Sequence, residues 1–511
     1  MKNKRMIVNI SASIIVFLVQ IGINFVLSPY ILQQLGEEAN GFINLANSFV
    51  QYATLLSVAV NSMANRYISV NYQRGNIKEA NSYFTTVFSV NVFLITLVSL
   101  VSMFMVFSLE NFILMSPKLV FQVKMTFMLS FINFSVSLLT TVYSASAFAT
   151  NRMDINSMQQ IVVNVVKGAL IFGFFVFFTP KIYYVSLAAL LSSVVAVVIN
   201  YVITRKLTPD LKIHINSFSF HKVKVLLTAG GWSALSSLSN LMLTGLDLLL
   251  ANLMVSPILM GRLAVAKTLP GAVGTLLTYF AAVFTASFTE IYAKNDMKLL
   301  VKENKNMLRM MAVLLTVPFA GIIVFGVDFL HLWLRTAEYT DAQLLQIYIL
   351  MLLELVNIIA NAYMYSVHSI FIVLVKVKMY SLMIFVSSIV SIGCTAILVK
   401  YTSLGVYAIA GTSTVILSVV NIFLVPMYAA KLLKEPTFSI VGVTMKSFMA
   451  LGITCLLFLP IRYLTSINSW GSFIGVAALA AVIGYILNIF LLYSREERKG
   501  LAGQLKAKLK R

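Results

Sequence analysis

Long apolar runs recur along the whole chain, and each is followed by a short polar or charged stretch. The runs show no regular alternation of period two, so they do not suit the strands of a membrane β-barrel. About 20 consecutive apolar residues let an α-helix cross the hydrocarbon core of a bilayer, which predicts about fourteen spanning helices here. Their expected ranges are 8–34, 41–65, 80–108, 119–149, 155–178, 182–204, 222–254, 261–291, 307–331, 343–369, 377–400, 403–430, 440–462 and 470–493.

The composition agrees with an all-α polytopic membrane protein. Of the 511 residues, 59% are hydrophobic and 11% are charged, whereas a soluble domain carries about 25% charged residues. The net charge of +21 would suit a nucleic-acid partner. However, the basic residues lie between the apolar runs, where they set membrane orientation. We therefore expect a lipid bilayer around the chain and no nucleic acid.

The distribution of lysine and arginine predicts the orientation. With the N-terminus in the cytoplasm, about 28 of the 38 Lys and Arg residues fall in cytoplasmic segments, as the positive-inside rule requires. The longest of these segments is Arg205 to Lys224, and the C-terminal tail is strongly basic. The first outer turn, Leu35 to Gly41, is acidic. Both termini are expected in the cytoplasm.

The same basic loop divides the spans into a group of six and a group of eight. The first two spans and the seventh and eighth are similar, with an outer turn that ends in Gly41 or Gly261. Repeats of this kind are typical of transporters. We predict two pseudo-symmetric six-helix lobes around a central hydrated cavity. The expected parts are 1–210 (N-terminal lobe), 211–435 (C-terminal lobe), 436–494 (two additional helices) and 495–511 (basic cytoplasmic tail).

Polar residues form stripes along five of the predicted spans. In the fifth span, for example, Asn156, Gln160, Asn164 and Lys167 fall within an arc of about 80°. Such residues either hydrogen-bond neighbouring helices or line a water-filled cavity. Five stripes exceed what packing needs, which favours the cavity. The candidates for a polar lining are Asn24, Gln51, Asn164, Asn240 and Asn361.

Four charged residues lie well inside predicted spans: Lys167, Lys267, Asp247 and Glu354. A charge at the bilayer centre costs roughly 2.5–3.5 kcal/mol on insertion scales, so each needs a partner or a function. Lys167 shares its face with amides and is expected to attract an anionic ligand, of which phosphate is the usual one.

The remaining cations have a plainer alternative. Arg66 and Arg152, at cytoplasmic span ends, either guide an anionic headgroup inward or anchor the helices. Arg262 and Lys124 lie near span ends, where they can snorkel to the interface. Asp247 and Lys267 are expected to pair in one conformation, with Glu354 as the alternative ion site. Pro270, inside the eighth predicted span, is expected to bend it.

No motif in the chain predicts catalysis. Gly261 to Thr268 resembles a P-loop, but Ala266 replaces the second glycine and no strand precedes the segment. Cys394 and Cys455 lie in apolar runs without a CxxC pair, which argues against a metal or redox site. We expect a protein that is not an enzyme and binds no metal or cofactor, with H⁺ or Na⁺ as the coupling ion.

The segment from Ser28 to Phe84 resembles the N-terminal region of Wzx-type polysaccharide flippases of the multidrug/oligosaccharidyl-lipid/polysaccharide exporter superfamily. The resemblance rests on Pro29, the Leu35–Gly36 turn, Gly41, the polar second helix, Arg66-Tyr67-Ile68, and Gly75 with Glu79-Ala80. It implies alternating access of an undecaprenyl-pyrophosphate-linked oligosaccharide, flipped to the outer leaflet of a bacterial plasma membrane. A polymerase and glycosyltransferases of the same pathway are the implied partners.

The resemblance also suggests roles for the candidate residues. The diphosphate would meet the cations Arg66, Arg152, Lys167 and Lys267, the sugars would meet the polar lining, and Asp247 and Glu354 would couple the ion. A lipid II flippase is a close variant of this reading. A cation-coupled multidrug antiporter of the same superfamily is the alternative, although it would need more acidic residues. A membrane glycosyltransferase or polymerase would need a larger outer loop.

Overall fold

The structure is a computed structural model that describes residues 2–498, apart from residues 151, 295, 338, 375, 494 and 496. Residues 499–511 of the predicted cytoplasmic tail lie outside this description. Within it, the chain is helical and contains no β-strand.

The predicted all-α polytopic fold is confirmed. In the part of the chain that the structure describes, thirteen helices are long and apolar enough to cross a membrane. They match thirteen of the predicted spans closely. The remaining predicted span, 261–291, corresponds to α10 (Pro257–Ala266) and α11 (Thr268–Ala293). The structure does not describe the side chains of residues 278–287 in α11, so α11 is not among the thirteen helices.

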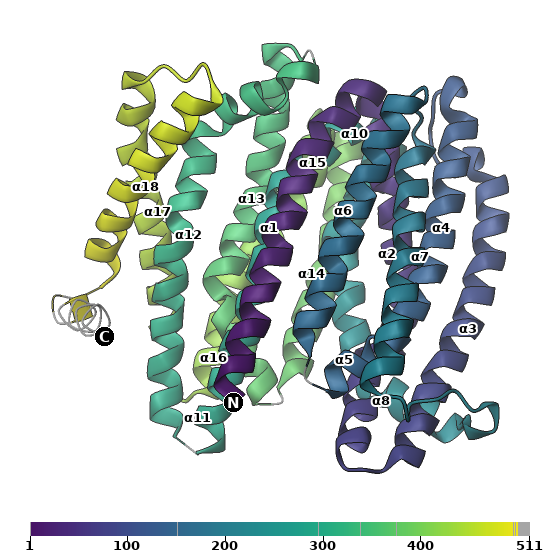
Figure 1. The fold of residues 1–511 in the computed structure, drawn as a ribbon. Helices are drawn as coiled ribbons and strands as arrows, with labels where there is room; N and C mark the ends of the chain where they lie inside the picture. The colour runs from purple at the N-terminus through teal and green to yellow at the C-terminus, as the bar shows by residue number, and fades with distance from the viewer. Residues whose placement is uncertain are drawn as a thin grey trace. The chain divides into compact units, whose positions relative to one another are not determined.

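The helices form two compact units. The first contains residues 1–265 and 384–409, and the second contains residues 266–383 and 410–511. The two pseudo-symmetric lobes that the sequence repeat predicts are defined differently from these units, and they stay a prediction. Figure 1 shows the helices with their labels. Helices of the first unit are α1 (Lys2–Leu35), α2 (Glu37–Gln73), α3 (Ile77–Phe107), α4 (Val120–Tyr143), α5 (Ala145–Ala149), α6 (Met153–Phe177), α7 (Tyr183–Leu207), α8 (Phe220–Asn240), α9 (Asp247–Met254) and most of α10.

The second unit contains the remaining long helices. In it, α12 packs against α13, α17 and α18, and α11 packs against α13; α12, α17 and α18 are easily followed side by side in Figure 1. Its helices are α11, α12 (Met297–Trp333), α13 (Asp341–Val373), α16 (Val425–Leu432), α17 (Ser439–Leu464) and α18 (Trp470–Leu492). Two helices, α14 (Val377–Tyr401) and α15 (Val406–Val419), begin in one unit and end in the other.

Two glycines of the resembling segment make its turns. Gly36, between α1 and α2, has φ of 83°, and Gly75, between α2 and α3, has φ of 76°. This left-handed region is open to glycine without steric cost. Asn76 then caps α3, because its side chain accepts a hydrogen bond from the backbone N–H of Glu79. These residues therefore set both ends of the long second span.

The eighth predicted span is interrupted at Lys267. Lys267 is a turn residue between α10 and α11, with φ of -73° and ψ of -13°, and Pro270 lies in the first turn of α11. A proline in the first turn loses no helical hydrogen bond, because the N–H groups of that turn have no partner in the helix. The interruption is therefore three residues before the position at which the sequence predicts a bend, and it lies at a charged residue.

A glycine brings α8 against α2. A Cβ atom added at Gly230 would lie 1.9 Å from the carbonyl oxygen of Ala59 and 2.8 Å from Oγ of Ser62. The two backbones therefore approach as closely as they do only because residue 230 has no side chain. The next residue, Gly231, has no heavy atom within 4 Å of the same added Cβ.

We expect Gly230→Ala to lower the free energy of unfolding by about 2 kcal/mol or more, because overpacking a tight contact forces the helices apart. Gly231→Ala is the matched control and should cost nothing, since alanine favours helix and meets open space there. Thermal unfolding of the purified protein in detergent measures both. Equal midpoints for the two variants would contradict the close contact.

Candidate functional site

A polar groove lies between α2 and the helical segment that begins with α8. Its volume is about 290 Å³. Two of the predicted lining residues, Gln51 of α2 and Asn240 of α8, meet in this groove and are exposed. Its full lining is Gln51, Thr54, Leu55, Val58, Ser237, Asn240, Leu241, Thr244 and Gly245.

The groove is bordered by a π-helical turn. Residues Leu241–Gly245 follow α8 in π-helical geometry, which is rare and widens the helix locally. The hydroxyl of Tyr52, on α2, donates a 2.7 Å hydrogen bond to the carbonyl oxygen of Gly245 at the end of this turn. Asp247, which begins α9 directly afterwards, is buried with 4% exposure. The turn, the groove and the buried carboxylate are therefore adjacent.

The side chains of the groove carry amides and hydroxyls but no charge. Such groups both donate and accept hydrogen bonds, so they suit a neutral ligand rich in hydroxyl groups. Gln51 and Asn240 are among the lining candidates that the sequence predicts, whereas the place of Ser237 in the groove depends on the crossing of α8 and α2.

Another polar residue of α2, Asn61, is not part of the lining of this groove. Asn61 and Asn91 of α3 exchange two side-chain hydrogen bonds of 3.2 Å, and Asn91 also donates to the carbonyl oxygen of Leu138 on α4. These amides join three helices inside the first unit. Amides in membrane helices commonly do this. The polar residues of α2 thus differ, because Asn61 joins helices whereas Gln51 lies on an open polar surface.

Lys167 is half-buried in α6, where the structure gives it no counter-charge. None of the described residues places a carboxylate within ion-pair distance of its Nζ atom. The next residue, Gly168, lies against α1, because a Cβ added there would be 3.2 Å from Cγ2 of Ile23. Asn24, the exposed neighbour of Ile23, therefore lies at the same level of the α1–α6 pair. Asn164, half-buried, is about one turn before Lys167.

The two cytoplasmic arginines differ. Arg66 is exposed on α2, and no carboxylate of the described residues pairs with it. Arg152 binds Asp154 through both Nε and Nη2, at 3.0 Å to Oδ1 and Oδ2 respectively. This hydrogen bond raises the pKa of Arg152, so its guanidinium stays charged but locally neutralised. Arg66 is therefore the more available cation.

Lys267 and Glu354 form an ion pair within the second unit. The Nζ atom of Lys267, at the break before α11, lies 3.2 Å from Oε1 of Glu354 on α13, and the two side chains are 22% and 10% exposed. The helix break places the lysine there. In this conformation, Lys267 thus contacts the carboxylate that the sequence proposes as the alternative ion site. The expected pairing of Lys267 with Asp247 in one conformation stays a prediction.

Asn361 belongs to a polar face of α13 in the same unit. Its amide oxygen is buried without a hydrogen-bond partner among the described residues. Further along this face, the ring centroid of His368 lies 5.9 Å from that of Tyr365 and 4.8 Å from that of Tyr380. Asn361 belongs to the second unit, whereas Gln51 belongs to the first.

Lys124 and Arg262, which the sequence predicts to snorkel toward the membrane interface, each form an ion pair in the structure. Lys124 donates to the carbonyl oxygen of Phe107 and pairs with Glu110 at 2.5 Å. Arg262 pairs with Glu37, the first residue of α2. Both are therefore bound within the protein. Across the ranges that the structure describes, no group of three or more His, Cys, Asp or Glu side chains is placed to hold a metal ion.

The fold is that of polytopic membrane transporters. The chain superposes on the lipid II flippase MurJ in an inward closed conformation with a TM-score of 0.69, at 13% identity, over 96% of this chain and 98% of that one. It also superposes on an inward-facing multidrug resistance MATE transporter of the MOP superfamily, with a TM-score of 0.67 at 15% identity, over 84% of this chain and 99% of that one.

Sequence comparison gives the family. Residues 6–288 match the polysaccharide biosynthesis protein family, and the chain belongs to it. It is 26% identical, over 96% of both chains, to the uncharacterized membrane protein EpsK of Bacillus subtilis (strain 168). The resemblance in the segment from Ser28 to Phe84 is thus confirmed at the level of the family.

The buried ion pair predicts an unequal response to two lysine substitutions. Lys267→Ala leaves Glu354 buried without its cation, and we expect the free energy of unfolding to fall by about 3 kcal/mol. Lys305→Ala removes the partner of Glu435 from a pair at 2.7 Å that is 25% and 28% exposed. Its loss should stay below about 1 kcal/mol.

Thermal unfolding in detergent gives both values, and Lys267→Met combined with Glu354→Gln should recover most of the loss. A Lys267→Ala variant no less stable than Lys305→Ala would contradict the pairing.

Proposed function

We propose that the protein is a flippase that moves an undecaprenyl-pyrophosphate-linked oligosaccharide from the cytoplasmic to the outer leaflet, by alternating access, for cell-surface polysaccharide synthesis. Membership of the polysaccharide biosynthesis family supports the pathway. The fold, which is shared with a lipid II flippase and with multidrug transporters, supports transport but leaves the cargo open, since one fold serves several functions.

Lys167 is the single observation that carries the proposal. A lysine inside a membrane-spanning helix is costly and is kept only for a function or a partner. Among the described residues, none supplies a carboxylate to Lys167. An anionic cargo would complete the charge, and the diphosphate of a lipid-linked glycan is such a group. Arg66, exposed at the cytoplasmic end of α2 in the predicted orientation, would meet it first.

The neutral groove supports the sugar half of the cargo. Gln51 and Asn240, with the hydroxyls of Thr54, Ser237 and Thr244, offer donors and acceptors without charge. Hydroxyl groups of sugars suit such a surface. Asn24, Asn164 and Asn361 are the further sugar-binding candidates, on α1, α6 and α13.

A multidrug antiporter with a cationic cargo is the less favoured function. Such a transporter would need carboxylates free to bind a cation. Glu354 is already neutralised by Lys267, and the groove of the first unit holds no carboxylate. The balance of charge at the candidate sites is therefore positive, which favours an anionic cargo.

The proposed ion coupling involves Asp247 and Glu354, with no other cofactor. When the diphosphate binds Lys267, Glu354 loses its counter-ion and takes up H⁺ or Na⁺, because a buried carboxylate is stable only when neutralised. Asp247, buried directly after the π-helical turn, is the second site for the ion.

The proposed location is the plasma membrane of a bacterium, with both termini in the cytoplasm. The distribution of Lys and Arg supports this orientation. The polymerase and glycosyltransferases of the same pathway are the proposed partners, since they would make the substrate and consume the product. The protein itself carries no proposed catalytic step.

We expect Lys167→Ala to lower surface glycan at least about tenfold, since the diphosphate loses its charged hydrogen bond, while protein levels stay normal. Lys167→Arg should keep part of the activity, because it keeps the charge but changes the geometry. Lys124→Ala is the matched control, a spanning lysine that is already paired, and should export normally. Surface polysaccharide in a complemented deletion strain is the measurement, and full export by Lys167→Ala would refute the role.

The carboxylates are tested by transport into vesicles under imposed H⁺ or Na⁺ gradients. Wild type should respond to one of the two gradients. Asp247→Asn and Glu354→Gln each remove a charge with little change of shape, and at least one should lose that response. If both respond as wild type does, the carboxylates are structural and the coupling proposal fails.

A further inference from the structure

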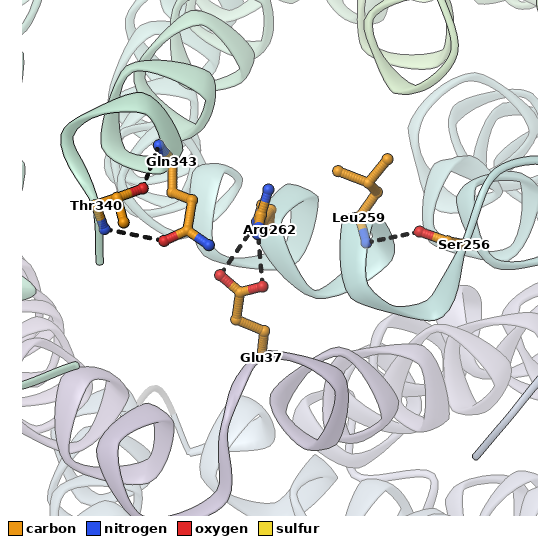
Figure 2. Close-up of polar contacts among 6 residues, drawn as sticks. All are labelled: Glu37, Ser256, Leu259, Arg262, Thr340 and Gln343. Atoms are coloured by element: carbon orange, nitrogen blue, oxygen red, sulfur yellow. Dashed lines mark hydrogen bonds and ion pairs between the residues drawn. The ribbon is translucent and has the colours of Figure 1, made fainter. Parts of the chain in front are cut away.

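An ion pair joins the start of α2 to α10. The Nε atom of Arg262 lies 3.1 Å from both Oε1 and Oε2 of Glu37, and Figure 2 shows the carboxylate facing the guanidinium. The two side chains are 16% and 18% exposed, for Arg262 and Glu37 respectively. Charge-assisted bonds of this geometry are stronger than ordinary hydrogen bonds. Ser256, whose hydroxyl accepts from the N–H of Leu259, caps the start of α10 (Figure 2).

Glycines lie beneath this ion pair. A Cβ added at Gly261 would be 2.2 Å from the carbonyl oxygen of Glu37, and one added at Gly41 would be 2.9 Å from Cα of Gly261. The backbones of α2 and α10 therefore touch with no side chain interposed. The terminal methyl group of Met260 also packs here, 2.7 Å from the Cβ added at Gly41, and the ion pair of Glu37 with Arg262 lies beside this contact.

The adjacent carboxylate has a different partner. Glu38 accepts hydrogen bonds from the backbone N–H and the hydroxyl of Ser116, at 3.0 and 2.7 Å. Ser116 belongs to the connection between α3 and α4, in the same predicted lobe as Glu38. Glu37 instead reaches α10, which belongs to the other predicted lobe. The same connection is also bound by α9, because the side chain of Asn252 exchanges two hydrogen bonds with the backbone of Leu114.

We propose that Glu37 and Arg262 are positioning residues of the transport cycle, a latch that closes the outer ends of α2 and α10 and parts for release of the glycan. This inference rests on the proposed flippase function and its orientation. The latch and the transport site share one short helix, because α10 ends at the break that places Lys267 beside Glu354. Movement of Lys267 onto the diphosphate would thus displace the helix that carries Arg262.

The test measures access to the groove from outside the cell. Thr244→Cys serves as the reporter in a background with Cys394→Ser and Cys455→Ser, and intact cells receive a membrane-impermeant maleimide. Glu37→Gln should raise the labelling rate about three- to tenfold, the shift expected when a partly shielded ion pair no longer favours the closed state. The tie from Asn252 to Leu114 keeps the effect partial. Glu38→Gln, the matched control on the same turn, should label as the reporter alone does.

Two further variants separate the latch from a general loss of structure. Glu37→Arg combined with Arg262→Glu restores the pair with reversed charges and should return labelling toward the reporter's rate. Gly261→Ala leaves both charges but separates the backbones, so it should raise labelling as Glu37→Gln does.

Three results would overturn the latch: no labelling in any variant, equal rates for Glu37→Gln and the reporter alone, or an equal rise in Glu38→Gln. The labelling needs no glycan, so it stays readable even if the flippase proposal fails in the export assay.

Discussion

The bilayer cannot solvate polar groups, and this constraint governs the whole chain. Every backbone N–H and C=O within it must bond internally, which is why the spans are helices. Several side chains follow the same rule, as in the amide pair of Asn61 with Asn91 and the ion pair of Lys267 with Glu354. Lys167 does not follow this rule, since no carboxylate of the described residues pairs with its ammonium group. This departure inside a membrane is the observation on which the proposed anion-binding role of Lys167 rests.

The second helix, α2, organises the site in the first unit. It contacts the segment from α8 to α10 at three successive places: the glycine contact at Gly230, the hydrogen bond from Tyr52, and the ion pair at Glu37. The polar groove lies at the level of the second place, where the π-helical turn alters the spacing of the backbone. One helix thus provides polar side chains to the groove and also fixes the elements that form its other wall.

The fold and the family leave different questions open. The architecture is shared with a lipid II flippase and with a multidrug resistance MATE transporter, and a shared fold does not by itself fix the cargo. The family places this chain in polysaccharide biosynthesis. Within the second unit Glu354 is paired with Lys267, whereas in the first unit no described carboxylate pairs with Lys167, and the proposal of an anionic cargo rests on this difference.

The sequence by itself predicted the all-α fold and the ranges of thirteen spanning helices, as well as the turns at Gly36 and Gly75. Apolar length and helical periodicity are local properties, and the bilayer imposes one required length. Only the tertiary structure decided which polar residues serve packing and which stay open. It also placed the break at Lys267, formed the π-helical turn before Asp247, and paired Arg262 with Glu37 across more than two hundred residues. These features depend on distances between helices that are far apart in the chain, and periodicity carries no information about such distances.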